Sequence, residues 1–272
     1  MFAGSRVRHI PILMYHAVQD GSTHPNPYYE TNVSPQVFAA HIRQLREEGF
    51  RGVSLGEALD ALKSGTSDEK LIVITFDDGY RDFYEAAFPV LSENRFTATV
   101  FLMTSFVGDA ASTFKGKQCL TWPQVRELAA HGIHFGSHTS THPQLRVLPT
   151  ERVEEELATS KQAIEDHLGA GIQSFSYPYA FPEPDWEFKR QLKDLLIKHG
   201  YENGVTTVLG TATDHSDPYF LPRLPVNTVD DSLFFQAKLD GAYNWVHGPQ
   251  YLSKLAGKLR GHLLQGSPTA SS

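Results

Sequence analysis

Short apolar runs alternate with amphipathic helical patterns along this chain of 272 residues, and this alternation restricts the fold more than any other feature of the sequence. The runs are short enough for strands, and the segments between them have helical periodicity. Strands that are apolar on both faces and separated by helices indicate a parallel sheet or a (β/α) barrel. The strand candidates are residues 10–15, 71–76, 97–103, 133–136, 172–177, 205–209 and 220–226.

The helical segments begin and end at recognisable residues. Ser34, followed by a proline, predicts an N-cap, and Thr121 with Gln124 forms a capping-box pattern. The segment 80–94 contains Pro89, which predicts a kink or a break. Further helices are expected over residues 35–49, 122–132, 151–168 and 185–199. No internal repeat or Pro/Ser-rich linker divides the chain, so we predict a single domain over residues 1–265 with a flexible tail at 266–272.

Composition excludes several classes of partner and ligand. Lys and Arg number 24 against 31 Asp and Glu, the net charge is -7, and no basic run is present, so we expect no nucleic-acid partner. The single cysteine, Cys119, excludes an intrachain disulfide and a cysteine-based zinc cluster. Thirteen histidines remain, so a transition metal would be held by nitrogen and oxygen ligands.

The sequence also bears on location. The start contains two arginines but no apolar region of about 7–15 residues, so it does not resemble a signal peptide. No stretch approaches the roughly 18 consecutive apolar residues of a transmembrane segment. We therefore expect a cytoplasmic protein, or an envelope or secreted one if an export signal has been removed. The sequence does not set an oligomeric state.

Two groups of polar residues follow apolar runs, where active sites of such folds lie. Asp77 and Asp78 come directly after the strand 71–76. Adjacent carboxylates repel each other unless a cation or a proton-transfer role offsets the repulsion. The alternative is a helix N-terminus, where one aspartate would act as a cap.

His138 and His142 follow the strand 133–136. Being four residues apart, they would face the same side of one helical turn, although two loop histidines can also be simply solvated. Two imidazoles with one carboxylate form a set that holds a transition metal and leaves positions open. Magnesium would favour more carboxylates. No nucleophile motif supports a catalytic serine.

The segments Thr75–Tyr80 and Ser137–His142 resemble the first two motifs of the polysaccharide deacetylases, carbohydrate esterase family 4 with its NodB homology domain. The segments Pro11–His16, Phe175–Ala180 and Leu221–Val226 resemble a subgroup related to the poly-N-acetylglucosamine deacetylases. The resemblance covers roughly residues 10–226. It implies an α/β fold, a deformed (β/α) barrel in a single domain, and an enzyme that removes N-acetyl groups from a saccharide substrate.

The resemblance also implies roles for individual residues. Asp78, His138 and His142 would hold a divalent transition metal, with Zn²⁺ preferred and Co²⁺ or Ni²⁺ as alternatives. Asp77 would be the general base that deprotonates a metal-bound water, and the metal would lower the pKa of that water. The backbone N–H of Tyr179 would stabilise the oxyanion.

The chain departs from the family pattern at the groups that assist the base and the leaving group. Ser176 stands where many members have an arginine, and Arg223 can replace that arginine or form a structural surface salt bridge. The family's leucine–x–histidine motif is not evident, so His16 is either the leaving-group acid or a structural histidine. Asp185 and the following tryptophan imitate another motif, but we interpret them as a helix start. Weaker acid candidates are His215, His247 and His262.

Other features have plainer interpretations. The acidic run 151–156 is expected to be a solvated helix face. For four aromatics, core packing or loop anchoring is favoured over stacking on sugars; these are Tyr28, Tyr29, Phe181 and Trp186. Two other functions stay open. One is a carbohydrate-binding protein on the same fold with little or no catalysis. The other is a hydrolase of a small cyclic amide.

Overall fold

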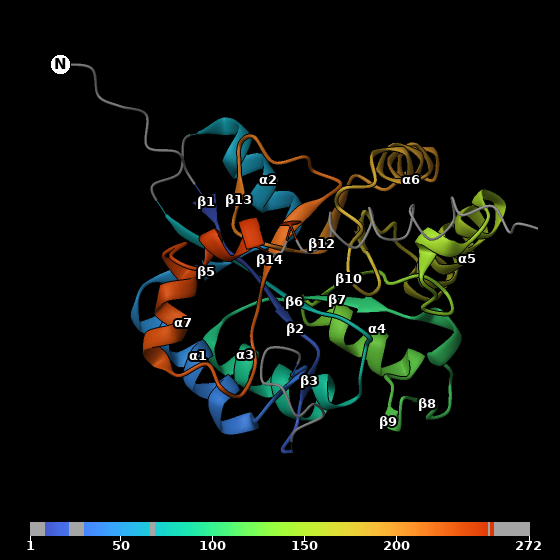
Figure 1. The fold of residues 1–272 in the computed structure, drawn as a ribbon. Coiled ribbons are helices and arrows are strands. Elements are labelled where there is room, and N and C mark those ends of the chain that lie inside the picture. The colour runs from blue at the N-terminus through green and yellow to red at the C-terminus, as the bar shows by residue number, and fades with distance from the viewer. Residues whose placement is uncertain (1–8, 22–29, 66–68, 250, 253–272) are drawn as a thin grey trace, which may run out of the picture.

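The computed structural model describes residues 9–21, 30–65, 69–249 and 251–252. Seven parallel strands form a closed barrel, because β6 pairs with β2 at the end of the order β2-β14-β12-β11-β10-β7-β6 (Figure 1). This confirms the barrel that the sequence predicts. The strands are β2 (Ile12–Tyr15), β6 (Lys70–Phe76), β7 (Thr99–Leu102), β10 (His134–Ser137), β11 (Ser174–Ser176), β12 (Asn203–Leu209) and β14 (Leu221–Pro225).

The chain also forms several short strands besides those of the barrel. The strand β5 (Phe50–Gly52) pairs with the first half of β6, and β7 pairs with the second half of the same strand. The sequence analysis did not predict β5. The remaining pairs are β1 (His9–Ile10) with β13 (Ala212–Thr213), β3 (Ala17–Val18) with β4 (Asn32–Val33), and the hairpin of β8 (Thr113–Phe114) and β9 (Lys117–Gln118).

Helices surround the barrel (Figure 1). The predicted N-cap at Ser34 and the capping box of Thr121 with Gln124 are both present. Unpredicted are α2, which has its own capping box, and α7. The α-helices are α1 (Pro35–Glu47), α2 (Leu55–Ser64), α3 (Phe88–Asn94), α4 (Trp122–Ala130), α5 (Thr150–Leu168), α6 (Trp186–Lys198) and α7 (Ser232–Leu239); single turns are η3 (Thr104–Phe106), η4 (Leu145–Val147) and η5 (Asn244–Val246).

Pro89 breaks the helix expected over residues 80–94. The segment starts as a π-helix, η2 (Phe83–Ala87), in which the N–H of Phe88 donates to the carbonyl of Phe83. Pro89 then lies in the first turn of α3. Because proline has no N–H, the turn before it cannot complete the ordinary ladder of hydrogen bonds, and the wider π spacing replaces it.

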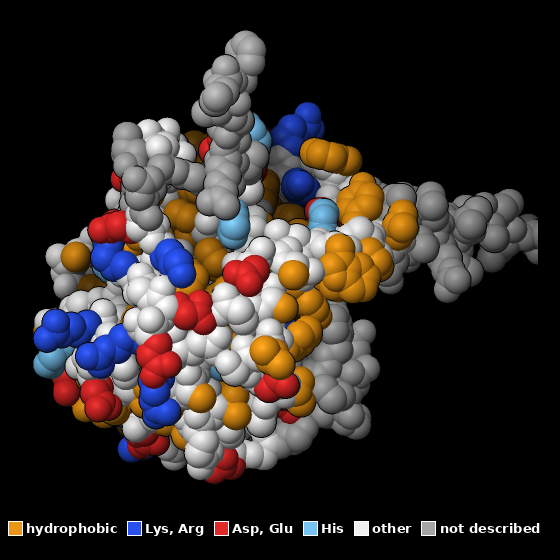
Figure 2. Space-filling model, turned by 90° about the vertical axis from the view of Figure 1, so that its left-hand side faces the viewer, with side chains coloured by type: hydrophobic (Ala, Val, Ile, Leu, Met, Phe, Trp, Pro, Cys, Tyr) orange, Lys and Arg blue, Asp and Glu red, His pale blue; other side chains and the backbone are white. Residues whose placement is uncertain are grey.

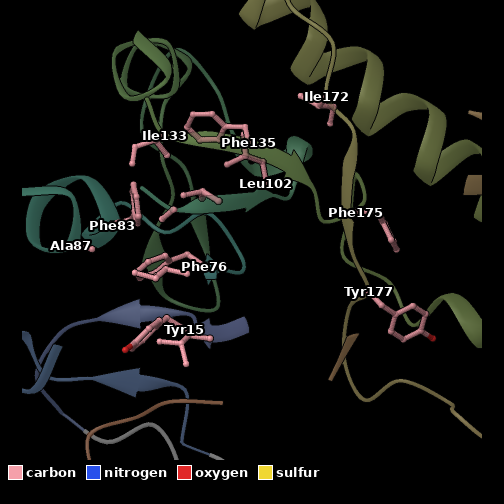
Figure 3. Close-up of a cluster of buried hydrophobic side chains, with 14 of the residues drawn as sticks. Tyr15, Phe76, Phe83, Ala87, Leu102, Ile133, Phe135, Ile172, Phe175 and Tyr177 are labelled. Atoms are coloured by element: carbon pink, nitrogen blue, oxygen red, sulfur yellow. The ribbon is translucent and has the colours of Figure 1, made fainter. Parts of the chain in front are cut away.

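The main hydrophobic core packs the barrel strands against the helices (Figure 3). Tyr15 on β2 stacks on Phe76 of β6 with ring centroids 5.3 Å apart, and Phe83 packs edge-on against Phe76 at 4.7 Å. These contacts fix the carboxyl end of β6, and Asp77 is the residue that directly follows it. The core thereby positions the residues that follow the strand.

On the face shown in Figure 2, Lys and Arg side chains are interspersed with Asp and Glu, next to a group of hydrophobic side chains. Of the helices in the described ranges, none combines the length and apolar character needed to cross a membrane. The predicted tail 266–272, together with Tyr28 and Tyr29, lies outside the described residues. The predicted bounds of the domain stay a prediction.

Candidate active site

A pocket of 430 Å³ lies where the carboxyl ends of several barrel strands meet. Its lining includes residues that directly follow β2, β6 and β10, and residues of the loop after β11. The predicted site residues that line it are His16, Asp77, Asp78, His138, His142 and Tyr179. The closure of the barrel therefore brings together residues that are far apart in the sequence.

Asp78, His138 and His142, called the metal set below, are buried next to one another. Nε2 of His138 lies 3.5 Å and Nε2 of His142 lies 3.4 Å from Oδ1 of Asp78. Three ligand atoms of this set lie within 4.8 Å of one another. Oδ1 of Asp78 has no hydrogen-bond partner among the described residues. A buried carboxylate oxygen without a donor needs a cation to compensate it.

The metal set fits a transition ion. Ligands bound at about 2.0–2.1 Å in a tetrahedron are about 3.4 Å apart, which matches the two distances to Asp78. Nδ1 of His138 donates to the carbonyl of Ser176 over 2.8 Å, which orients the ring with Nε2 toward Asp78. Burial, followed by the charge of His138, lowers the pKa of His142 to about 3, so this imidazole is neutral. Neutral imidazole is the form that binds a metal.

The segment that carries the two histidines is not helical, so the predicted helical turn is wrong. His138 directly follows β10, and the chain then turns through left-handed conformations at Thr139 (φ 67°) and His142 (φ 57°). The N–H of His142 donates to Oγ1 of Thr139 over 3.0 Å. This side-chain bond folds the loop back, and the rings come within 4.8 Å of each other.

Glu156 on α5 stabilises the same loop, and its predicted solvation is wrong. The side chain is 4% exposed. Its Oε2 accepts hydrogen bonds from the N–H groups of Ser140 and Thr141, both at 2.8 Å, and its Oε1 accepts one from Oγ1 of Thr141 at 2.6 Å. The loop between the metal-set histidines thus turns around a buried carboxylate. The sequence does not indicate this contact, because Ser140 and Glu156 are sixteen residues apart.

Arg223 projects from the middle of β14 into the barrel and binds Asp77. Its Nη1 lies 2.8 Å from Oδ1 and its Nη2 lies 2.7 Å from Oδ2 of Asp77, a bidentate pair. The arginine is 0% exposed. The alternative of a surface salt bridge is therefore wrong. Its remaining bonds go to the carbonyl of Thr206, to Oγ1 of Thr75 and to Oγ of Ser176.

Ser176 connects the two halves of the site, which the sequence did not indicate. Its Oγ donates to Oδ1 of Asp77 over 3.0 Å, while its carbonyl accepts from His138. Burial alone would raise the pKa of Asp77, but the charges of Arg223 and His138 outweigh burial and hold that pKa well below its usual range. Asp77 is thus ionised at neutral pH. Asp77, Arg223, Ser176 and Thr75 form what is called the inner network below.

Tyr179 adopts a left-handed conformation (φ 60°) in the loop after β11. Its ring lies 4.5 Å from that of His142. Within the described part of the chain, no acceptor is bonded to its backbone N–H. A free N–H on a residue that lines the pocket is a group that can bind a negatively charged oxygen.

His16 lies at the pocket, unlike the two other candidate acids that the structure describes. Its Nε2 is 3.9 Å from Oδ2 of Asp77, and burial lowers its pKa despite the charge of Asp77. His215 is 84% exposed and pairs with its neighbour Asp214, whereas His247 pairs with Glu183. Neither lines the pocket. His262 lies outside the described residues.

Comparison with known proteins identifies the family. A family model described as polysaccharide deacetylase matches residues 64–204, which is more than half of the chain. The chain belongs to the polysaccharide deacetylase family. The protein YxkH of Bacillus subtilis (strain 168), named as a polysaccharide deacetylase, is 32% identical over 219 residues, covering 80% of this chain and 71% of YxkH.

Two further deacetylases are similar to this member of the family. The poly-beta-1,6-N-acetyl-D-glucosamine N-deacetylase of Staphylococcus aureus (strain MSSA476) is 22% identical over 205 residues, covering 72% of this chain and 68% of that protein. The structure of the Streptococcus pyogenes deacetylase PplD in complex with acetate superposes with a TM-score of 0.73 at 25% identity, covering 86% of this chain and 99% of PplD.

Two of the aromatic residues considered in the sequence analysis differ in their burial. Phe181 is 1% exposed and packs in the core, as predicted, but Trp186 is 72% exposed, so core packing is wrong for it. Trp186 opens α6, and the helix start predicted there is confirmed. Asp185 binds Arg146 over 2.8 Å.

Proposed function

We propose that this protein is a metal-dependent hydrolase that removes N-acetyl groups from saccharides of the N-acetylglucosamine type. The observation that carries the proposal is the buried metal set, with the ionised carboxylate of Asp77 beside it at the base of one pocket. The name of the S. aureus relative supports this substrate class, and the acetate complex of PplD supports an acetyl product.

In this proposal Asp78, His138 and His142 hold the ion. A set of two imidazoles and one carboxylate favours Zn²⁺, with Co²⁺ and Ni²⁺ as alternatives, over Mg²⁺. When bound, the ion supplies Lewis acidity toward the acetamide carbonyl and lowers the pKa of water. The protein's own part is to keep the imidazole of His142 neutral and to hold the three ligands together in a buried site.

Asp77 acts as the general base. It must stay off the metal in order to take the proton of the attacking water, and the bidentate contact with Arg223 gives it a fixed position inside the barrel. Arg223 is then a positioning residue that replaces the arginine expected at Ser176. It also keeps Asp77 ionised, which a proton acceptor requires.

The oxyanion and the leaving amine need two further groups. The unbonded N–H of Tyr179 donates to the oxygen that becomes negatively charged. His16, 3.9 Å from Asp77, passes the proton that Asp77 has taken from the water on to the leaving nitrogen. The carbohydrate-binding alternative was motivated by the missing arginine and acid, and the contacts of Arg223 and His16 weaken that motive.

The test is acetate release from an N-acetylglucosamine tetramer. We expect activity that a chelator abolishes and that zinc or cobalt restores. Asp77→Asn should reduce kcat by roughly 10²–10⁴-fold, the usual contribution of a general base. Asp60→Asn is the matched control, because Asp60 is an exposed aspartate on α2.

Three results would contradict the proposal. Undiminished activity of Asp77→Asn would exclude the mechanism. Saccharide binding that persists after metal removal, without turnover of any acylated substrate, would favour the carbohydrate-binding protein. Turnover limited to single-ring amides would favour the hydrolase of a small cyclic amide.

A further inference from the structure

The β8–β9 hairpin places a lysine at the wall of the pocket. Its two-residue turn consists of Lys115 and Gly116, with φ values of 50° and 79°. Two consecutive positive φ angles define the type I′ turn, whose first position favours Asn, Asp or Gly. Lysine is not among the residues that this conformation favours. A residue whose type disagrees with its local backbone conformation is a reason to look for a function.

Aromatic rings hold the lysine next to the metal set. The ammonium nitrogen of Lys115 lies 4.8 Å from the ring centroid of Phe114 and 5.2 Å from that of Tyr179. Both rings in turn pack against His142, at 5.2 Å and 4.5 Å. The cation is therefore fixed by cation–π contacts on the same side of the pocket as His142.

No ion pair uses up this charge. In the residues that the structure describes, no carboxylate lies within salt-bridge distance of Lys115; Asp77 pairs with Arg223, and Asp78 lies beside the two histidines. Glu30, another acidic residue of the lining, accepts hydrogen bonds from the N–H groups of Thr31 and Asn32. Lys115 lines the pocket and is exposed, so its charge is open to a ligand.

We propose that Lys115 recognises an anionic substituent, a carboxylate or a phosphate, on the saccharide that carries the acetamide. The inference rests on the proposed function and narrows its substrate from N-acetylated saccharides in general to acidic ones. A lysine that only stabilised the oxyanion would not distinguish neutral from acidic substrates. A lysine that recognises an anionic substituent makes the protein bind acidic saccharides more tightly than neutral ones.

Binding to the metal-free protein tests this without relying on catalysis. The probes are N-acetylglucosamine, its 1-phosphate and 6-phosphate, N-acetylmuramic acid and inorganic phosphate, titrated by NMR at 50 mM and 500 mM NaCl. We expect at least one acidic sugar to bind about tenfold more tightly than N-acetylglucosamine at low salt. Screening should reduce this ratio at high salt, because the ammonium is exposed.

Three variants assign the preference to the lysine. Lys115→Asn suits the type I′ turn and removes the charge, so the ratio should fall to about one, whereas Lys115→Arg should retain most of it. Lys63→Asn, which removes an exposed lysine of α2 outside the pocket, is the matched control and should keep the ratio.

Several results would overturn the inference. One is that none of the three acidic sugars binds more tightly than N-acetylglucosamine. Another is a preference that survives in Lys115→Asn. Inorganic phosphate binding as tightly as the sugar phosphates would show a free-anion site instead. Because these are binding measurements, they stand apart from acetate release, whose failure would count against the proposed function alone.

Discussion

The inner network and the metal set lie side by side but differ in how their charges are satisfied. Asp77 accepts three hydrogen bonds from Arg223 and Ser176, and its charge is balanced inside the barrel. Its sequence neighbour Asp78 has an oxygen without a partner among the described residues and faces the imidazoles of His138 and His142. The first group is complete as a protein structure, whereas the second is complete only with a cation.

The largest expected effect comes from breaking the inner network. Arg223→Met leaves the Asp77 carboxylate buried and unpaired, so we expect a loss of about 3–5 kcal/mol in the free energy of unfolding. Urea denaturation measures it. The control Arg51→Met removes an exposed ion pair with Glu69 and should cost no more than about 1 kcal/mol.

The double variant Asp77→Asn with Arg223→Met checks the reason. Since both charges are then gone, the combined loss should be smaller than the sum of the two single losses. Additive losses would mean that the two side chains stabilise the barrel independently.

The metal set should respond to the loop behind it. Glu156→Ala removes the acceptor of three loop hydrogen bonds and should weaken zinc binding by about 10–100-fold, as is usual for residues that orient metal ligands. Competition with a chromophoric chelator measures the affinity. Glu155→Ala, which changes the exposed neighbouring glutamate, should leave the affinity unchanged. Equal affinities for both variants would contradict a positioning role for Glu156.

A third aspartate, Asp82, extends the comparison to the pH dependence of the free energy of unfolding. Burial raises its pKa to about 6, and its Oδ1 has no hydrogen-bond partner among the described residues. The folded state therefore holds a proton that the unfolded state, with a pKa of about 4, releases earlier, so stability falls as pH rises from about 4 to 6. Asp82→Asn should remove this fall and add about 2–3 kcal/mol at pH 7, since one pKa unit corresponds to about 1.4 kcal/mol.

Urea denaturation at pH 4, 5, 6 and 7 tests the prediction for Asp82. The variant and the unaltered protein should have equal stability near pH 4, where the folded carboxyl is protonated. A constant difference across the whole range would show that the substitution acts through packing, not through the proton.

Sequence patterns predicted the barrel well because its strands are local. Each of the apolar runs became a barrel strand, and the groups at their carboxyl ends met as expected. The patterns overlooked the strand β5 and the helix α2. The strand has only three residues, which is too short to give a pattern. They also could not place Arg223 inside the barrel, because its partner Asp77 is 146 residues away and only barrel closure unites them.

Glu156 and Ser176 show the same limit at the site. A glutamate in an acidic helical run looks solvated, and nothing local indicates that a loop of the neighbouring strand covers it. A serine in place of an expected arginine looks like a loss. In the folded chain its small side chain leaves room for Arg223 to enter from β14 and bonds to both Asp77 and that arginine.

The left-handed residues have a consequence for how this protein would change under selection. Of the six non-glycine residues with positive φ in the described ranges, five are at or beside the pocket: Asp78, Lys115, Thr139, His142 and Tyr179. Each conformation costs about 1–2 kcal/mol that glycine would not incur. A library screened for heat resistance alone would therefore accumulate glycine and asparagine at these positions first, and the most heat-resistant descendants would be the least able to do chemistry.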